Sequence, residues 1–161
     1  MKKLFCMLFS FLFLFSASCS AGNQGEPKIC ERLAFYERDG MLSALLSFAA
    51  DESGKSEAET FSRKNARELL DALLSTKDTI LYKSVRTVIF EDSLSEARKK
   101  ELLCALFSRA EFQLKAEAYE KEDVFSPFTP LAAKKVGTLP AYYREKMNKP
   151  FGKGGGLSLD T

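Results

Sequence analysis

Hydrophobic residues along most of the chain are spaced three and four positions apart, the interval that places side chains on one face of an α-helix. This spacing begins at 29–36, resumes at 42–49 after an Asp-Gly turn signal, and returns at 66–75. The tetrapeptide Ser-Glu-Ala-Glu at 56–59 has the form of a helix capping box ahead of the third segment. The spacing therefore predicts helices in all three segments.

The second half of the chain continues this spacing. Residues 81–89 carry it as well, although their β-branched side chains make a strand at 85–90 the competing interpretation. Ser95 opens the longest predicted helix, which runs to about Lys121. A short final helix is predicted to start at Pro140, because proline suits the first turn of a helix.

These elements together predict an all-α fold, a small helical bundle or stacked helical hairpins of about four to six helices. We expect a single helical domain over residues 28–148. A polar tether at 19–27 precedes it, and the glycine-rich segment 149–161 follows it as a flexible tail.

One heptapeptide pattern, which begins Leu-Leu-x-Ala-Leu with Met in the first position of the first copy, occurs at 41–47, 69–75 and 102–108. The starting positions differ by about 28 and 33 residues, near the periods of helical-hairpin repeats. The residues that mark tetratricopeptide repeats are missing, and amphipathic helices commonly contain this pattern. The sequence alone leaves open whether these segments are structural repeats.

The first residues have the layout of a bacterial secretory signal. Lys2 and Lys3 form a positive start, residues 4–15 are uncharged and rich in Leu and Phe, and small residues fill 16–22. The apolar stretch is shorter than the roughly 20 residues that a membrane-spanning helix needs. We therefore expect residues 1–18 to be removed as a signal peptide.

The end of this signal, Ser16-Ala17-Ser18-Cys19, resembles the lipobox of bacterial lipoproteins. In that family small residues lead into a cysteine that is acylated and becomes the mature N-terminus, with palmitate a typical acyl chain. Ser16 departs from the family, which most often has Leu there, and a cut after Ala21 by general signal peptidase is the alternative. The resemblance implies lipidation of Cys19, and the absence of an acidic residue after it favours the outer membrane if the host has one.

Two cysteines remain in the mature domain once the signal is removed and Cys19 is lipidated. They are Cys30 and Cys104. An exported chain with two cysteines most economically forms one disulfide, so we predict a Cys30–Cys104 bridge. Two free buried thiols are the alternative.

The composition excludes several classes of chemistry. The chain has no histidine, which removes Ser-His-Asp and Cys-His hydrolases and His-ligated zinc sites. It also lacks a Ser-x-x-Lys motif and a glycine-rich loop placed between a strand and a helix. A formal net charge of +2 gives no electrostatic footprint for nucleic acid. We predict no catalytic residues, no metal and no cofactor.

Basic residues are concentrated near the C-terminus. Residues 131–161 hold six Lys and Arg against two acidic residues, whereas the preceding mature chain is acidic overall. This segment is predicted to contact a partner or an anionic surface through Lys134, Lys135, Arg144, Lys146 and Lys149. The alternative is that these charges neutralise the acidic elements of their own domain.

Two other functions stay open. The first is a glycan-cleaving enzyme that uses one glutamate from the carboxylates late in the longest predicted helix. These carboxylates are Glu111, Glu117, Glu120, Glu122 and Asp123. The simpler interpretation is that they form the solvated, charged face of that helix. The second function is that of a carrier for a hydrophobic ligand, in which phenylalanine side chains would line a cavity. The candidates are Phe48, Phe61, Phe90, Phe107 and Phe112. The alternative is that these side chains fill an ordinary hydrophobic core.

The sequence as a whole favours an exported, lipid-anchored binding or scaffold protein of the bacterial cell envelope. Its partners would be the membrane, through the N-terminal lipid, and an envelope protein. Neither the identity of that protein nor its binding surface follows from the residues.

Overall fold

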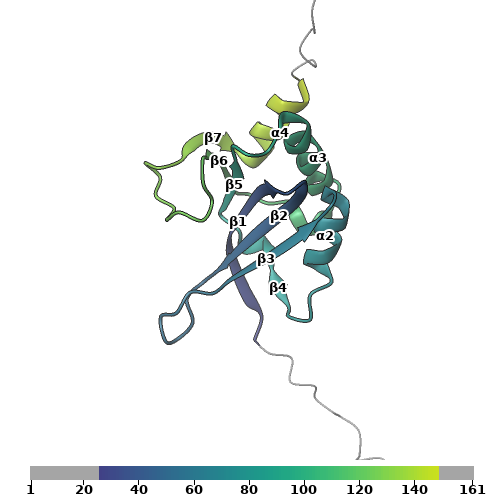
Figure 1. The fold of residues 1–161 in the computed structure, drawn as a ribbon. Helices are drawn as coiled ribbons and strands as arrows, with labels where there is room; N and C mark the ends of the chain where they lie inside the picture. Colours follow the sequence, from purple (N-terminus) through teal and green to yellow (C-terminus); the bar gives the residue numbers. More distant parts are fainter. Residues whose placement is uncertain (1–25, 149–161) are drawn as a thin grey trace, which may run out of the picture.

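A computed structural model describes residues 26–148 of the chain. The described part is a seven-stranded mixed sheet with three α-helices, all packed on one face of the sheet (Figure 1). The strands are β1 (Lys28–Arg38), β2 (Met41–Phe48), β3 (Ala58–Arg63), β4 (Ile80–Leu81), β5 (Thr87–Glu91), β6 (Glu117–Lys121) and β7 (Lys134–Thr138). The helices are α2 (Ala66–Leu74), α3 (Glu96–Phe107) and α4 (Leu139–Asn148). The predicted all-α fold is therefore wrong.

The strand order is β3-β2-β1-β5-β6-β7, with the short β4 pairing with the start of β1. The three central strands β1, β5 and β6 are parallel, and the outer strands on both sides are antiparallel to their neighbours. The carboxyl ends of the three central strands therefore meet at one edge of the sheet. Open sheets with parallel strands commonly bind ligands beyond this edge.

The first two predicted helices are instead a β-hairpin. In β2, Leu42, Ala44 and Leu46 all face the helices, and this alternation has the period of a strand. Leu42 and Leu46 also satisfy the four-residue helical interval, which is why the pattern was ambiguous. The decisive signal is the turn, because Asp39 and Gly40 both have positive φ (52° and 72°), as the tightest hairpin turns require.

In β1 the side chains of residues 33–36 are all buried. Leu33 and Phe35 face the helices, whereas Ala34 and Tyr36 belong to a smaller hydrophobic cluster on the opposite face. A strand covered on both faces has a continuous apolar run in place of an alternating one. Such a run is compatible with a buried helix, so its period alone does not identify the strand.

The helical predictions in the second half of the chain are partly confirmed. Helix α2 follows the predicted leucines but begins at Ala66 with Asn65 as its cap, so the cap predicted at Ser56 is wrong. Ser95 caps α3 as predicted, through a hydrogen bond that its hydroxyl accepts from the Arg98 amide.

Other boundaries differ from the prediction. Helix α3 ends at Phe107, and the segment assigned to its last turns forms β6 instead. The competing interpretation of 85–90 as a strand is confirmed by β5, and α4 begins one residue before Pro140.

The three copies of the heptapeptide pattern do not adopt one structure. The copy at 41–47 lies in β2, and the copies at 69–75 and 102–108 lie mainly in α2 and α3. The pattern is therefore not a structural repeat.

The main hydrophobic core lies between the sheet and the three helices. Phe35 and Phe90 stack at its centre with ring centroids 5.9 Å apart, and Tyr142 from α4 packs on Phe90 at 5.2 Å. The phenylalanines considered as a ligand cavity pack in or against this core, with Phe48, Phe90 and Phe112 buried and Phe61 and Phe107 half-buried.

The predicted disulfide is wrong. Cys30 in β1 is a free, buried thiol that contacts the Arg32 carbonyl at 3.4 Å, and Cys104 is a free, exposed thiol on α3 with its sulfur 3.7 Å from that of Met147. Cys30 is buried in the core between the sheet and the helices, whereas Cys104 is on the exposed side of α3, an arrangement that cysteine counting cannot anticipate. Burial raises the pKa of the Cys30 thiol to about 12.

The two thiols should differ sharply in reactivity. We expect iodoacetamide to label Cys104 in the native mature chain, and to label Cys30 at least about a hundredfold more slowly because its thiolate is scarce and its surroundings exclude reagent. Peptide mass spectrometry before and after unfolding in urea measures both rates. Cys104→Ser serves as the control, and blockage of both sites until a reductant is added would contradict the free-thiol structure.

Candidate functional site

Charged side chains are buried where the carboxyl ends of the central strands meet. Glu91 ends β5 and is fully buried, Lys121 ends β6 and is 4% exposed, and Arg38 ends β1 beside them. Burial of a charge is costly unless the group is paired and hydrogen-bonded. The contacts of these residues therefore show which parts of the chain the buried charges join at this edge of the sheet.

The Glu91 carboxylate binds the Arg38 guanidinium with both oxygens, at 2.5 Å (Nη1–Oε2) and 2.9 Å (Nη2–Oε1). It also accepts hydrogen bonds from the Ser93 hydroxyl at 2.5 Å and from the Val124 amide at 3.1 Å. Burial alone would raise the pKa of this carboxyl, but these hydrogen bonds and the charge of Arg38 hold the pKa below its ordinary value. Glu91 is thus an ionised anchor that joins β1, β5 and the chain after β6.

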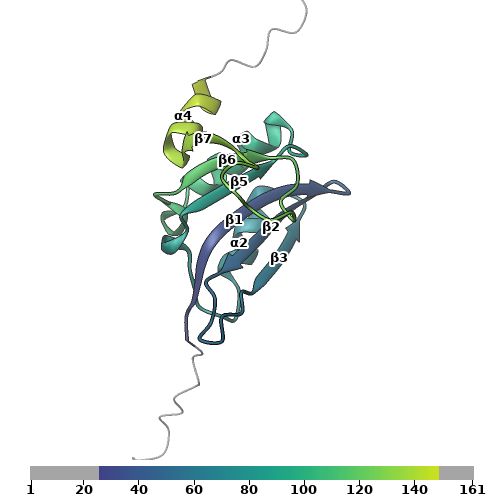
Figure 2. The ribbon, with the colours of Figure 1, turned by 90° about the vertical axis from the view of Figure 1, so that its left-hand side faces the viewer.

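Lys121 also binds the chain that follows β6. Its ammonium donates to the carbonyl oxygens of Asp123 and Ser126 and to the Ser126 hydroxyl. Glu91 and Lys121 together fix the start of the long connection 122–133 between β6 and β7. Figure 2 shows this segment crossing the face of the sheet opposite the helices.

Aromatic contacts continue the attachment of this segment. Phe125 meets Tyr36 edge to face with centroids 5.0 Å apart, and Phe128 meets Tyr119 in the same way at 5.2 Å. The Arg32 guanidinium lies over the ring of Phe128, 4.6 Å from its centroid. The segment is thus held to β1 and β6 at several points along its length.

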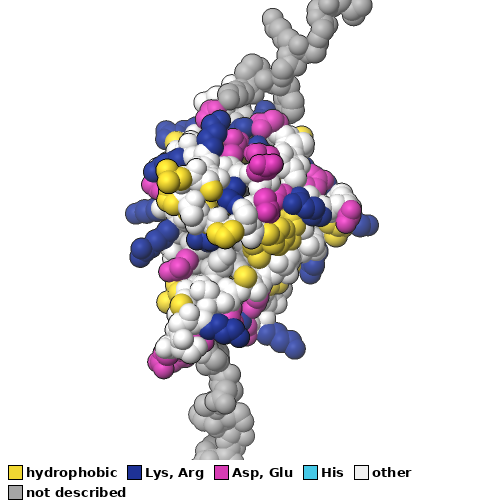
Figure 3. All heavy atoms as spheres, turned by 60° about the vertical axis from the view of Figure 1, so that its left-hand side comes forward, with side chains coloured by type: hydrophobic (Ala, Val, Ile, Leu, Met, Phe, Trp, Pro, Cys, Tyr) yellow, Lys and Arg dark blue, Asp and Glu magenta, His cyan; other side chains and the backbone are white. Residues whose placement is uncertain are grey.

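Large apolar side chains nevertheless remain exposed on this segment. Phe125 is 58% exposed and Leu131 is 100% exposed, the two most exposed large hydrophobic residues among those the structure describes. Figure 3 shows hydrophobic side chains interrupting the charged surface on this side of the molecule. We define the docking face as the residues of this segment and the adjoining strands that form this surface, namely Arg32, Leu45, Phe125, Phe128 and Leu131.

Arg32 is the polar member of the docking face. Its Nε is buried without a hydrogen-bond partner, and no acidic side chain within residues 26–148 forms an ion pair with it. A guanidinium that rests on an aromatic ring can offer its terminal N–H groups to a carboxylate, although the buried Nε of Arg32 stays out of reach. Arg32 is therefore suited to bind an anionic group from outside the domain.

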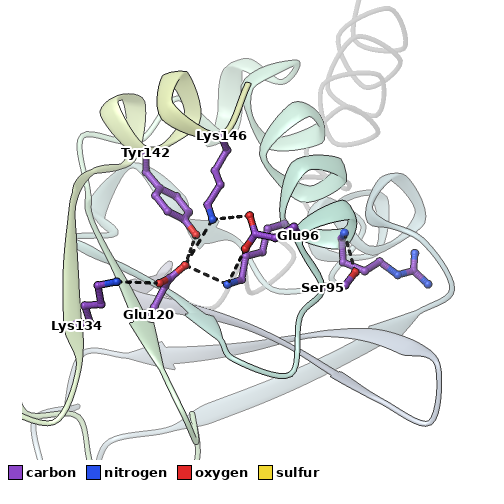
Figure 4. Close-up of polar contacts among 8 residues, drawn as sticks. Ser95, Glu96, Glu120, Lys134, Tyr142 and Lys146 are labelled. Carbon is purple, nitrogen blue, oxygen red and sulfur yellow. Dashed lines mark hydrogen bonds and ion pairs between the residues drawn. The ribbon is translucent and has the colours of Figure 1, made fainter. Parts of the chain in front are cut away.

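A second ionic cluster lies on the other face of the sheet, beneath α4 (Figure 4). The Glu120 carboxylate of β6 accepts hydrogen bonds from the Tyr142 hydroxyl at 2.7 Å and from the Lys99 ammonium at 3.0 Å. The Lys146 ammonium binds Glu96 at 2.6 Å and lies 3.8 Å from Glu120. These contacts join α3, α4 and β6.

Every charge drawn in this second cluster has a partner of opposite sign. Burial opposes ionisation of Glu120, but the hydrogen bonds from Tyr142 and Lys99 hold the pKa of its carboxyl below the ordinary value. Burial and the hydrogen bond to Glu120 raise the pKa of Tyr142, so its phenol stays protonated. The cluster therefore fastens α4 to α3 and to the sheet.

The basic residues predicted to contact a partner are not gathered in one patch. Lys146 is buried in the second cluster, whereas Lys134 is exposed and lies 3.9 Å from Glu120. Lys135 is half-exposed and binds Glu117, and Arg144 is exposed on α4. Lys149 lies outside the described residues.

The carboxylates considered for catalysis are also dispersed. Glu111 is exposed in a 3₁₀ turn, where it borders a surface hollow with Tyr82, and Glu117 is bound by Lys135 and Tyr119. The hydrogen bond from Lys135 is the main cause of a lowered pKa for the Glu117 carboxyl. Among these candidate carboxylates, Glu117 and Glu120 have a lowered pKa and are ionised at neutral pH. A general acid needs a raised pKa instead.

Within residues 26–148, no three His, Cys, Asp or Glu side chains are grouped so that they hold a metal ion. The same part of the chain contains no helix long and apolar enough to cross a membrane. Comparison with protein-family models, with curated proteins and with solved structures finds no match. The candidate site is consequently defined by its geometry.

Sequence reasoning missed the main residues of the docking face. Phe125 and Phe128 lie in the stretch 122–133, for which the sequence predicts no element, and Arg32 lies in a segment predicted as a helix. One available signal is the group of large apolar residues at 124–131, which lie before, between and just after the two prolines. Turn segments seldom contain so many unless they pack on something or bind something.

Replacing the buried anchor should weaken the whole edge. We expect Glu91→Gln to lower the free energy of unfolding by about 2 kcal/mol at neutral pH, because it leaves Arg38 and a buried amide position imperfectly paired. Urea denaturation measures this value. Asp92→Asn, at the neighbouring exposed position, is the control and should change stability little.

The wild type and Glu91→Gln also test how the stabilising effect of Glu91 depends on pH. The pKa of Glu91 is lower in the folded than in the unfolded state, so its contribution is present above its unfolded pKa of about 4.3 and is lost as pH falls through the folded value. The stability difference between the wild type and Glu91→Gln should therefore shrink below about pH 4. A difference that grows on acidification would contradict an ionised Glu91.

Proposed function

We propose that this chain is an exported protein of a bacterial envelope, anchored by lipid on Cys19, and that its folded domain binds a protein partner on the docking face. The observation that carries the binding proposal is the exposure of Phe125 and Leu131 on a segment that buried ions hold at its start and the Phe128 ring holds further along. Exposed apolar residues that stand singly need no explanation, but a fixed group of them favours an interaction site.

The ordered conformation of the segment 122–133 favours binding for an entropic reason. A segment that is already ordered loses little conformational entropy when a partner docks, so more of the contact free energy becomes affinity. Aromatic side chains beside an arginine are also the residues that contribute most at protein interfaces. Phe125, Phe128 and Arg32 supply this combination.

The charge of the docking face indicates the chemistry of the partner. Arg32 lies over the Phe128 ring and has no internal counter-ion among the described residues. A partner surface with an apolar centre and an adjacent carboxylate complements this arrangement. We therefore infer an acidic protein surface as the occupant.

Binding is supported over catalysis by the state of two carboxylates, the buried Glu91 and the partly buried Glu120. Glu91 and Glu120 are both engaged by cations and hydrogen-bond donors that hold their pKa values low. An enzyme that cleaves glycans with one glutamate needs a protonated acid, which burial without such partners provides. Both groups instead serve to hold elements together.

Anchoring is supported by the signal layout and by the lipobox-like residues before Cys19. The first strand of the domain begins at Lys28, so a short segment would link the lipid to the sheet. Such an arrangement places the docking face close to a membrane.

The anchor is tested by the intact mass of the protein extracted from membranes. We expect a chain of residues 19–161 bearing a diacylglycerol and one further acyl chain, with no change of mass on reduction because Cys30 and Cys104 are free. Cys19→Ser should lose the lipid and leave the membrane fraction. An unmodified chain that begins after Ala21 would refute the anchor and leave the binding proposal standing.

The docking face is tested by photo-crosslinking in the cells that make the protein. A benzoylphenylalanine at position 131 should give one discrete protein adduct, whereas the same probe at position 81 should not. Leu81 is the matched control, because it is also an exposed leucine, at 41%, but lies in β4, away from the docking face.

The charge of Arg32 provides the second arm of this experiment. Arg32→Glu should reduce the adduct formed from position 131 at least about tenfold, and Arg32→Lys should retain part of it. Equal adducts from positions 81 and 131, adducts with lipid alone, or no effect of Arg32→Glu would each overturn the proposal.

A further inference from the structure

Strand β3 forms one margin of the sheet. It pairs with β2 on one side, and α2, which follows it, packs behind the sheet (Figure 2). No described element lies beside its outer edge. An edge strand of this kind offers unpaired backbone groups to another strand.

The register determines which backbone groups face outward. The Phe48 amide donates to the Glu57 carbonyl at 3.0 Å, and the β2–β3 ladder continues this register as Ser47 opposite Ala58. In an antiparallel pair, alternate residues direct their N–H and C=O groups to the neighbour. Residues 57, 59, 61 and 63 therefore bond to β2, and Ala58, Thr60 and Ser62 present their backbone groups to the free edge.

These three outward positions are symmetric about Thr60. When a second β3 approaches antiparallel with Thr60 opposite Thr60, Ala58 of one copy faces Ser62 of the other. Each of these pairs exchanges both of its backbone hydrogen bonds. The edge is thus complementary to itself in this register.

The side chains suit the same register. Glu57 of one copy falls opposite Arg63 of the other, and the two-fold symmetry produces this pair of opposite charges twice. Both residues occupy non-hydrogen-bonded positions, where facing side chains are closest. Phe61, half-buried at the edge of the main core, meets Phe61 of the second copy diagonally.

We propose that β3 is a self-association edge, through which two copies of this chain form a two-fold dimer with a continuous sheet centred on Thr60. This proposal concerns a different surface from the docking face, so either proposal can fail without the other.

In the single chain, contacts within the chain occupy part of the β3 edge, and pairing would replace them with contacts to the second copy. The Arg63 guanidinium donates to the outward Ser62 carbonyl at 2.7 Å, and Glu57 lies 3.5 Å from the Lys28 ammonium. In the dimer the Ala58 amide of the second copy replaces Arg63 at that carbonyl, and Arg63 moves to Glu57 of the second copy. A basic residue at an exposed edge also hinders pairing in any other register.

Charge reversal tests the register directly. Glu57→Arg places Arg opposite Arg63 twice, and Arg63→Glu places Glu opposite Glu57 twice, so each variant alone should raise the dimer dissociation constant about tenfold or more. A mixture of the two variants restores both opposite-charge pairs, and so does the double variant. Sedimentation velocity of the full chain in mild detergent measures the dissociation constants.

Matched controls separate this effect from a general effect of charge. Glu52→Arg makes the same change in the exposed turn before β3, and Arg67→Glu makes it on the exposed side of α2. Both should dimerise like the wild type. Circular dichroism of every variant verifies that the fold is retained.

A cysteine at the symmetry centre gives a second measurement. In a Cys104→Ser background, Thr60→Cys should form an intermolecular disulfide on oxidation, because hydrogen-bonded partners lie about 5.5 Å apart between Cα atoms. Ala58→Cys should not, since two copies of residue 58 are separated by about 13 Å along the strands. A monomeric wild type, a mixture of charge variants that fails to regain the dimer, or equal cross-linking at positions 58 and 60 would overturn the proposal.

Discussion

The buried Glu91 carboxylate is the constraint on which the arrangement of this domain depends. An ionised group at the end of a central strand is tolerated only if its charge and its lone pairs are fully engaged. Arg38 from β1, Ser93 and the Val124 amide meet that demand. Satisfying one carboxylate therefore fixes the ends of two parallel strands and the path of the chain after β6.

This constraint explains why the two faces of the sheet are covered so differently. Parallel strands need cover on both faces, and the three helices all lie on one of them. The second face is covered over Ala34, Ile89 and Tyr119 by the segment 122–133 alone. A single segment buries less apolar surface than a layer of helices, and Phe125 and Leu131 remain in contact with solvent. The docking face is the direct result of that incomplete cover.

Sequence reasoning recovered the parts of the fold that local chemistry specifies. Ser95 caps α3 and the leucines of α2 follow its buried face, because capping and helical spacing act within a few residues. It fails for β1 and β2, whose side chains satisfy both periods. The Asp-Gly pair at 39–40 is the local signal that distinguishes the hairpin from two helices. The contacts of Arg32 with Phe128 and of Glu91 with Arg38 join residues far apart in the chain, and no pattern in one sequence specifies such pairs.

The two proposed surfaces are geometrically compatible. A two-fold axis through Thr60 runs perpendicular to the sheet, so the helices of both copies lie on one side of the extended sheet and both docking faces lie on the other. The docking face reaches β2 at Leu45, which lies opposite Thr60, whereas pairing at the edge uses the outward backbone groups of β3 and neither Phe125 nor Leu131. A dimer would therefore present two docking faces in the same direction. Two linked sites bind a partner with paired epitopes more tightly than one site does, without any additional contact, provided that the spacing matches.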